Sequence, residues 1–247
     1  MSSSPRFRTL VTFALSAVAF AVVVPAHAAP SSPSGAAPSA VRAAAVKNVK
    51  FKKKVVGTGT AKSCTYARLA KAVRSGGDIR FNCGPDPVTI VVKKTLVVCN
   101  THNCKDAWTG GKRVTKVRIN GGGKVTLSGG GERGILYANT CDHKLGWIDG
   151  HCDTQTTPHV DLRNITLRDG NATKGPAGYD GVSGGGGGGA VAMRGGQLTV
   201  KNAKFTKNRC MKSHSDAGGG AIRVTGQRKT ARIYGSRFTH NRCASGG

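Results

Sequence analysis

Three segments of the chain repeat the same alternation of apolar and polar residues and align with one another without gaps. They span residues 160–172, 198–210 and 231–243, so their starts lie 38 and 33 residues apart. In the second segment Leu198, Val200 and Phe205 are apolar, and polar residues stand beside them. Alternation with a period of two is typical of β-strands that bury one face. We therefore expect each segment to form strands with one apolar side.

Glycine runs precede two of these segments and complete a repeating unit. Residues 187–189 lead into Ala190-Val191, and residues 218–220 lead into Ala221-Ile222. A unit of 33 to 38 residues, with three short strands and no helix, cannot bury its apolar face alone. Stacked units, in contrast, share a continuous core. The pattern predicts an all-β solenoid of parallel strands. An up-and-down barrel is the alternative, but it does not explain why the same positions recur at a fixed period.

Stacking in this register brings identical residues together. Cys210 would lie on Cys243, Asn208 on Asn241 and Phe205 on Phe238. Neighbouring parallel strands are about 4.8 Å apart, a separation that suits a disulfide. We therefore predict a Cys210–Cys243 disulfide.

The other cysteines are assigned by proximity along the chain. The sequence has 8 cysteines and no Cys-x-x-Cys motif, so disulfides are favoured over a zinc site and no metal centre is expected. We predict the pairs Cys64–Cys83, Cys99–Cys104 and Cys141–Cys152.

One helix is predicted before the strands begin. Residues 63–74 place apolar side chains at helical spacing, with Ser63 as the N-cap and Gly76-Gly77 as the stop. Short β-branched runs follow at residues 78–81, 88–92, 95–98, 117–119 and 124–127, and each is expected to be a strand.

The N-terminal residues have the features of a signal peptide. Arg6 and Arg8 precede an apolar stretch at residues 10–24, and Ala26-His27-Ala28 fits a cleavage site. We expect residues 1–28 to be removed on secretion, residues 29–54 to form a flexible Ala/Ser/Pro-rich and then Lys-rich linker, and residues 55–247 to form the β domain. No second long apolar stretch follows, so no transmembrane span is expected after cleavage. The last residues match the start of a further glycine corner, which suggests a solenoid truncated at its C-terminus.

Charge indicates the kind of partner. Lys and Arg number 38 against 11 Asp and Glu, for a formal charge of +27, while aromatics make up only 5%. A strongly basic protein attracts polyanions. Secretion and the scarcity of stacking aromatics argue against intracellular nucleic acid, so we expect an acidic polysaccharide or an anionic cell surface. Trp108 and Trp147 are candidates for stacking on sugars, or they serve as local packing residues.

Several of these motifs resemble a known family. They are residues 57–61 (GTGTA), 76–84 (GGDIRFNCG), 121–130 (GGGKVTLSGG), 164–167 (NITL) and the Gly-Gly-Ala-Val/Ile runs. Together they resemble secreted bacterial right-handed parallel β-helix repeat proteins of the pectin-lyase-like superfamily, close to polymorphic outer-membrane-protein repeats. The resemblance implies a right-handed parallel β-helix with a short N-terminal capping helix.

The family includes enzymes, and each type of enzyme needs particular catalytic groups. A hydrolase of the polygalacturonase type needs paired carboxylates, and the chain has no Asp-Asp pair and a single Glu, Glu132. A pectate-lyase-like enzyme would need carboxylates for calcium, here Asp161, Asp169 and Asp180, and a base, here Arg163 or Arg168. Asp161 and Arg163 share one face of a strand, so a solvated ion pair is the simpler interpretation.

The sequence therefore predicts a secreted scaffold that binds anionic polysaccharide and needs no cofactor. The alternatives are a calcium-dependent polysaccharide lyase and an adhesin or surface-protein passenger fragment.

Overall fold

The computed structural model describes residues 52–102, 104, 113–146, 155–173, 187–211 and 218–243. The chain divides into two compact units, Met1–Lys47 and Asn48–Gly247, and every described residue belongs to the second. The predicted signal peptide and residues 29–51 of the predicted linker lie outside the described residues. The first strand begins at Lys53, two residues before the expected start of the folded domain.

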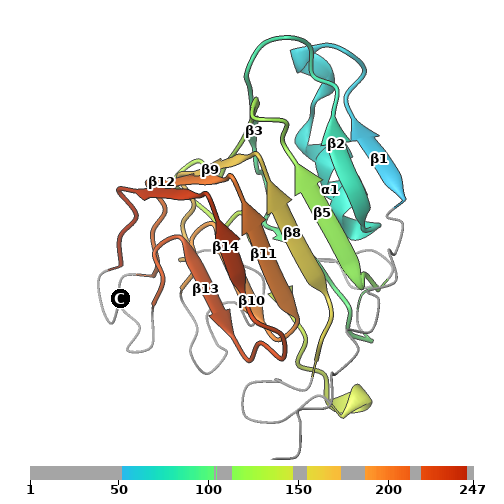
Figure 1. Ribbon diagram of the computed structural model, residues 1–247, viewed down its shortest axis with the longest axis vertical. Helices are drawn as coiled ribbons and strands as arrows, with labels where there is room; N and C mark the ends of the chain where they lie inside the picture. Colours follow the sequence, from blue (N-terminus) through green and yellow to red (C-terminus); the bar gives the residue numbers. More distant parts are fainter. Residues whose placement is uncertain are drawn as a thin grey trace, which may run out of the picture. The chain divides into compact units, whose positions relative to one another are not determined.

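Parallel strands dominate the described structure and form three sheets (Figure 1). The six-stranded sheet contains, in spatial order, β1 (Lys53–Val56), β2 (Gly77–Phe81), β5 (Lys116–Asn120), β8 (His159–Arg163), β11 (Gln197–Lys201) and β14 (Arg232–Tyr234). The five-stranded sheet contains β3 (Val88–Val91), β6 (Val125–Ser128), β9 (Thr166–Arg168), β12 (Lys204–Thr206) and β15 (Arg237–Thr239). The four-stranded sheet contains β4 (Leu96–Val97), β7 (Leu136–Asn139), β10 (Val191–Arg194) and β13 (Ile222–Thr225).

The chain visits the three sheets in turn. After β2 it forms β3 and β4, then returns to the six-stranded sheet as β5, beside β2, and the order repeats. The register confirms the repeat found in the sequence, because Val160 pairs with Leu198 and Thr199 pairs with Arg232. The predictions of strand-rich structure and parallel pairing are thus confirmed.

Most strands lie where the sequence predicts them, but β7 was missed. Its residues Leu136, Tyr137 and Ala138 are all buried. A strand buried on both faces has no polar side, so it shows none of the alternation on which the prediction depended.

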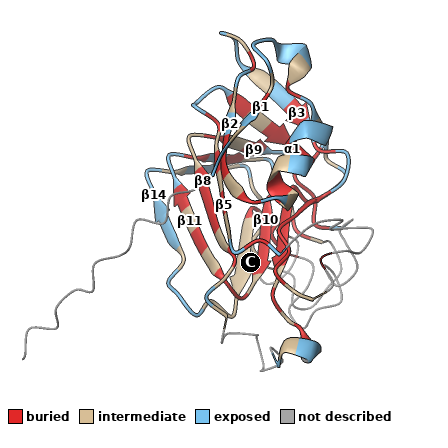
Figure 2. Ribbon diagram, turned by 90° about the vertical axis from the view of Figure 1, so that its right-hand side faces the viewer, coloured by how far each residue is buried: buried red, intermediate tan, exposed pale blue. Residues whose placement is uncertain are grey.

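The core lies between the sheets and consists of columns of side chains that repeat from strand to strand. In the six-stranded sheet Ile79, Ile119, Leu162 and Val200 occupy matched positions, and each is fully buried. In the five-stranded sheet Leu127, Leu167 and Phe205 do the same. Figure 2 shows buried residues in red on β8 and β11. Each column removes apolar surface from water because neighbouring strands supply the partners.

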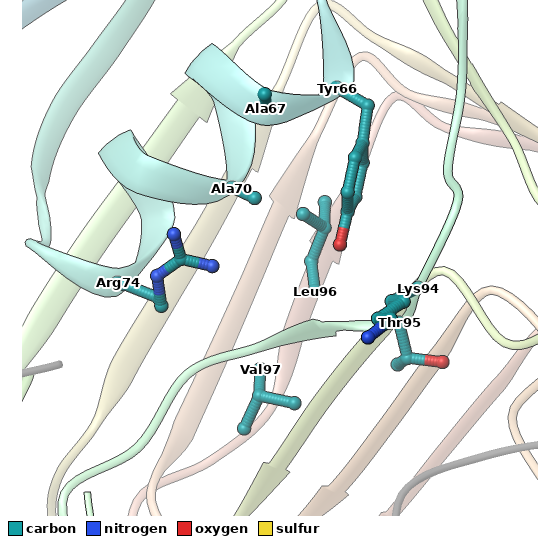
Figure 3. Close-up of a pocket in the computed structure, with 8 residues that line it drawn as sticks. All are labelled: Tyr66, Ala67, Ala70, Arg74, Lys94, Thr95, Leu96 and Val97. Atoms are coloured by element: carbon teal, nitrogen blue, oxygen red, sulfur yellow. The ribbon is translucent and has the colours of Figure 1, made fainter. Parts of the chain in front are cut away.

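The one α-helix of the described residues, α1 (Tyr66–Arg74), packs against β1, β2 and β4. Leu69, Ala70 and Val73 form its buried side, and Figure 3 shows Ala70 facing the strand that carries Leu96. The N-cap is Thr65, whose side chain accepts a hydrogen bond from the backbone N–H of Arg68.

The prediction that Ser63 caps this helix is wrong. Ser63 ends a short 3-10 helix, η1 (Ala61–Ser63), and its hydroxyl donates to the Thr60 carbonyl instead. The predicted stop at Gly76-Gly77 is confirmed. Both residues have positive φ, at 63° and 101°, which favours glycine.

Three predicted disulfides are present. Cys64–Cys83, Cys99–Cys104 and Cys210–Cys243 have Cα–Cα distances of 5.6, 5.6 and 4.9 Å. Cys141 is disulfide-bonded, and its predicted partner Cys152 lies outside the described residues.

The stacking predicted around the Cys210–Cys243 bond is also confirmed. The rings of Phe205 and Phe238 are stacked, with centroids 4.7 Å apart, and the Asn208 side-chain amide donates to Asn241 Oδ1 at 2.9 Å. Asn208 is fully buried. Its other hydrogen bonds, to the Leu167 carbonyl and from the Gly170 N–H, tie it to the preceding strand as well.

Candidate anion-binding surface

The outward face of the six-stranded sheet carries the densest group of charged side chains on the described strands. Successive side chains of a strand point to opposite faces of the sheet, so the residues next to the core positions face away from the core. The outward cations are Lys53, Arg80, Lys116, Arg118, Arg163, Lys201 and Arg232, and the outward carboxylates are Asp78 and Asp161. We call this set the basic face. Its strands lie side by side in Figure 1.

One row of the basic face alternates in sign from strand to strand. Lys53 pairs in register with Asp78, Asp78 with Arg118, and Arg118 with Asp161. The row continues through Thr199 to Arg232. Cross-strand pairs of opposite charge stabilise a sheet by a few tenths of a kcal/mol, up to about 1 kcal/mol.

Asp161 is the centre of this row. Its two carboxylate oxygens each accept a hydrogen bond at 2.8 Å, one from Arg118 Nε and one from Arg163 Nε. The carboxylate is 1% exposed, while Arg118 and Arg163 keep 22% and 34% of their side-chain surface in solvent. The predicted pairing of Asp161 with Arg163 is therefore present, but the carboxylate is buried beneath the arginines rather than solvated.

A neighbouring row contains cations without carboxylates. From β5 to β14 the paired positions hold Asn120, Arg163, Lys201 and Tyr234, and Arg80 faces outward on β2. Arg80 forms an ion pair with Asp78 at 3.1 Å but leaves 51% of its side chain exposed. Lys201 and Arg232 are exposed at the end of the sheet. The carboxylates are thus covered, and the guanidinium and ammonium groups remain accessible.

The electrostatics of the basic face follow from this arrangement. The hydrogen bond to Asp161, together with its charge and that of Asp78, raises the pKa of Arg163 and keeps it a cation despite partial burial. Burial lowers the pKa of His159, and although Asp161 opposes this effect, Lys116, Arg118 and Arg163 add to it. The His159 ring forms a hydrogen bond with the Thr199 hydroxyl, Nε2 to Oγ1, at 2.9 Å. The basic face is therefore positively charged even beside its carboxylates, Asp78 and Asp161.

The second predicted carboxylate and arginine lie on a different sheet. Arg168 ends β9 in the five-stranded sheet, and its Nη1 is 3.0 Å from Asp169 Oδ2. Asp169 follows the strand with φ 53°, as Lys207 and His240 do at 54° in the next two repeats. Asp169 thus occupies a recurring corner position, and the structure does not bring it into the Asp161 cluster.

No other predicted site residue adds to these groups. Trp108, Trp147 and Asp180 lie outside the described residues. Within the described ranges, no three His, Cys, Asp or Glu side chains come together as metal ligands would.

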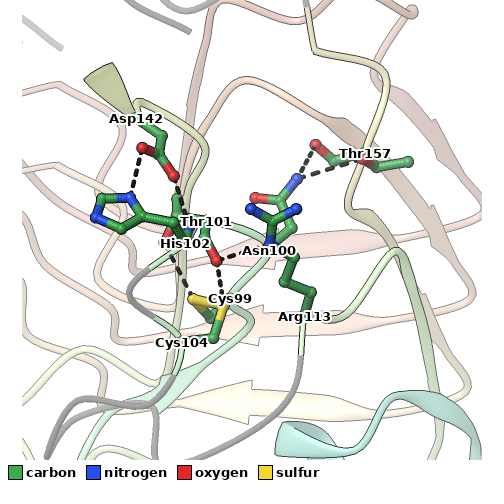
Figure 4. Close-up of a disulfide and its surroundings, with 8 residues drawn as sticks. All are labelled: Cys99, Asn100, Thr101, His102, Cys104, Arg113, Asp142 and Thr157. Carbon is green, nitrogen blue, oxygen red and sulfur yellow. Dashed lines mark hydrogen bonds and ion pairs between the residues drawn. A yellow bond between two sulfur atoms is a disulfide. The ribbon is translucent and has the colours of Figure 1, made fainter. Parts of the chain in front are cut away.

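Sequence reasoning missed a pair of a half-buried histidine and a buried aspartate beside the Cys99–Cys104 disulfide (Figure 4). Asp142 Oδ1 is 2.6 Å from His102 Nδ1, and Asp142 Oδ2 accepts from the His102 backbone N–H at 2.6 Å. Burial alone would raise the pKa of Asp142, but the hydrogen bonds and charge of His102 and the backbone N–H of Lys144 outweigh it and lower the pKa. The residues are 40 apart in sequence, and no motif in the sequence joins them.

Comparisons of the chain with protein-family models, with curated proteins and with solved structures find no match. Among the helices of the described residues, none combines the length and the apolar character that crossing a membrane requires.

Proposed function

We propose that the three sheets are the sides of a right-handed parallel β-helix, a solenoid of the pectin-lyase-like class, with α1 as its N-terminal cap. Support comes from the order in which the chain visits the sheets and from the stacking of residues one repeat apart. A helix over the first strands protects edges that would otherwise pair with other chains.

On this scaffold the protein acts as a secreted binder of acidic polysaccharide, and the basic face is the binding surface. Disulfides are typical of proteins outside the cell. The observation that carries the proposal is the set of outward cations on the six-stranded sheet, exposed on its outer strands and partly exposed on β5 and β8, whose nearby carboxylates are already covered and paired. Six strands at about 4.8 Å spacing extend over about 24 Å, a length that suits a polymer better than a small ligand.

The physical basis is additive weak attraction. A single exposed ion pair contributes about 0–1 kcal/mol, so one cation cannot hold a ligand. Several cations in a row can hold a polyanion, because each repeat of the polymer meets another charge. Such binding weakens as salt screens it. Asp161 orients Arg118 and Arg163 by bonds to both guanidinium groups, which reduces the conformational freedom that binding would cost.

The test is retention of the secreted protein on immobilised polygalacturonate during a salt gradient. The triple variant Arg80→Gln, Lys201→Gln, Arg232→Gln should bind about tenfold more weakly than the unaltered protein and elute at lower salt. The matched control is Lys204→Gln, Lys207→Gln, Arg237→Gln, which removes the same charge from exposed positions of the five-stranded sheet and its corner. Equal losses in both variants would mean that net charge acts without a defined surface, and absence of retention by the unaltered protein would refute polysaccharide binding.

A further inference from the structure

A cavity separates the side of α1 from β4, at the end of the molecule away from β14. Its volume is about 320 Å³, and it is lined by Tyr66, Ala67, Ala70, Arg74, Lys94, Thr95, Leu96 and Val97. Figure 3 shows the Tyr66 ring reaching from the helix toward the segment that carries Lys94 and Leu96, while the Arg74 side chain lies beside the helix near Ala70. The basic face contributes none of these residues, so the cavity is a separate feature.

The walls of the cavity combine apolar and polar side chains. Ala70, Leu96 and Val97 are buried by the surrounding core, and Ala67 adds a small side chain at the exposed side of the helix. The two alanines leave space where longer side chains would fill it, so the Tyr66 ring and Leu96 can contact a flat apolar group. The Thr95 hydroxyl donates to the Gly134 carbonyl at 2.9 Å, which holds this segment in place.

The rim of the cavity is positive. Arg74 is half-buried and Lys94 is exposed, and within the described ranges neither side chain forms an ion pair with a carboxylate. Burial raises the pKa of Tyr66, although Arg74, the Lys94 backbone and Arg133 act in the opposite direction. The phenol therefore stays neutral, and the charged groups acting on it are all cations.

β4 borders the cavity, and among the described strands it pairs on one side only. It is the outermost strand of the four-stranded sheet. The backbone N–H groups of Leu96 and Val98 donate to the Ile135 and Tyr137 carbonyls of the neighbouring strand region. In a parallel strand the residue between them, Val97, points its N–H and C=O away from that neighbour.

From these features we infer that the cavity binds a small carboxylate with a flat apolar body. A space of this size equals the liquid volume of about ten water molecules, enough for one or two rings but too small for a folded partner. The apolar body would lie among Ala70, Tyr66 and Leu96, and the carboxylate would be bound by Arg74 and Lys94. Mixed apolar and convergent polar lining is typical of small-molecule sites.

The probe for this site is naphthoate, with naphthamide as the neutral analogue of the same shape. Titration of the secreted protein, followed by calorimetry, should show naphthoate binding at least tenfold more tightly than naphthamide. Arg74→Gln should weaken naphthoate binding about tenfold, because a charge-assisted hydrogen bond is lost. The matched control is Arg68→Gln, which removes the same charge from an exposed position of the same helix.

A second variant tests the cavity itself. Ala67→Phe adds a ring at the exposed side of the site, leaves the buried side of α1 unchanged, and should abolish naphthoate binding while the unfolding transition is retained. Equal affinity for naphthoate and naphthamide, or equal weakening by Arg74→Gln and Arg68→Gln, would overturn the inference. Retention on polygalacturonate should be unchanged in Ala67→Phe. The proposal for this cavity and the proposal for the basic face can therefore be refuted independently.

Discussion

The repeats at residues 198–210 and 231–243 share one sequence pattern and one backbone path but differ in burial. Phe205 is fully buried, whereas Phe238, stacked upon it, is 43% exposed. Val200 is fully buried, whereas Ile233 in the matched position is 46% exposed. Figure 2 shows the contrast between buried β11 and exposed β14.

The difference shows that the apolar pattern of a repeat does not bury its residues by itself. β11 pairs with β8 on one side and β14 on the other, and both neighbours cover its apolar side chains. Among the described residues, no strand pairs with the second side of β14. The same residue type should therefore contribute unequally to stability in the two repeats.

The largest expected effect is on the stacked phenylalanines. Phe205→Ala should lower the free energy of unfolding by about 3–5 kcal/mol, because it removes a fully buried ring and leaves a cavity. Phe238→Ala should cost about 1–2 kcal/mol, because much of that ring already contacts water. Urea unfolding with the disulfides intact measures both. Equal costs for the two variants would show that residues outside the described part of the chain cover Phe238 in solution.

The next effect concerns the disulfide that joins the two repeats. Cys210–Cys243 closes a segment of 33 residues, whereas Cys99–Cys104 closes one of 5. Loop-closure entropy predicts that replacing Cys210 and Cys243 by serine costs about 3–4 kcal/mol, against about 2 kcal/mol for Cys99 and Cys104. Chemical denaturation of the two double variants tests the order. A smaller cost for the Cys210–Cys243 pair would mean that stacking alone holds the last repeat.

The smallest expected effect is a dependence of stability on pH. It should leave the difference in stability contribution between the two repeats unchanged. Neither repeat contains an acidic residue, whereas Asp142 has a lowered pKa in the folded state. A lowered pKa stabilises the fold above the pKa of an unfolded Asp, near 3.9, and that contribution is lost as the pH falls through the folded value.

The free energy of unfolding should therefore be lower at pH 3 than at pH 6, and Asp142→Asn should reduce this difference. The difference between Phe205→Ala and Phe238→Ala should stay the same at both pH values. A change in that difference with pH would contradict the assignment of the acid sensitivity to the His102–Asp142 pair.

Much of the fold could be predicted because the repeat encodes its own register. Once residues 198–210 and 231–243 are aligned, the contacts of Phe205, Asn208 and Cys210 with their counterparts follow from strand spacing alone. Ser63 and β7 escaped prediction for local reasons. Two residues with hydroxyl groups, Ser63 and Thr65, precede the helix, and Thr65 is the one that caps it. β7 is buried on both faces and shows no alternation.

The candidate site was predictable only in part. The alternation of side chains along one strand predicted that Asp161 and Arg163 share a face. The second arginine, Arg118, is 43 residues away in sequence. It reaches Asp161 because β5 and β8 are neighbours. The His102–Asp142 pair and the cavity beside α1 likewise join distant segments, so no local pattern marks them.

The sequence by itself determined the strand-rich class, the parallel stacking register and the three disulfides seen in the described residues. The register and the Cys210–Cys243 bond depend on periodicity, and the other two disulfides depend on proximity along the chain. The tertiary structure decided which charges are covered and which remain exposed, and where a cavity remains between a helix and a strand edge. Those outcomes depend on which segments become neighbours, and burial, pairing and the pKa of a side chain are properties of neighbours rather than of the residue alone.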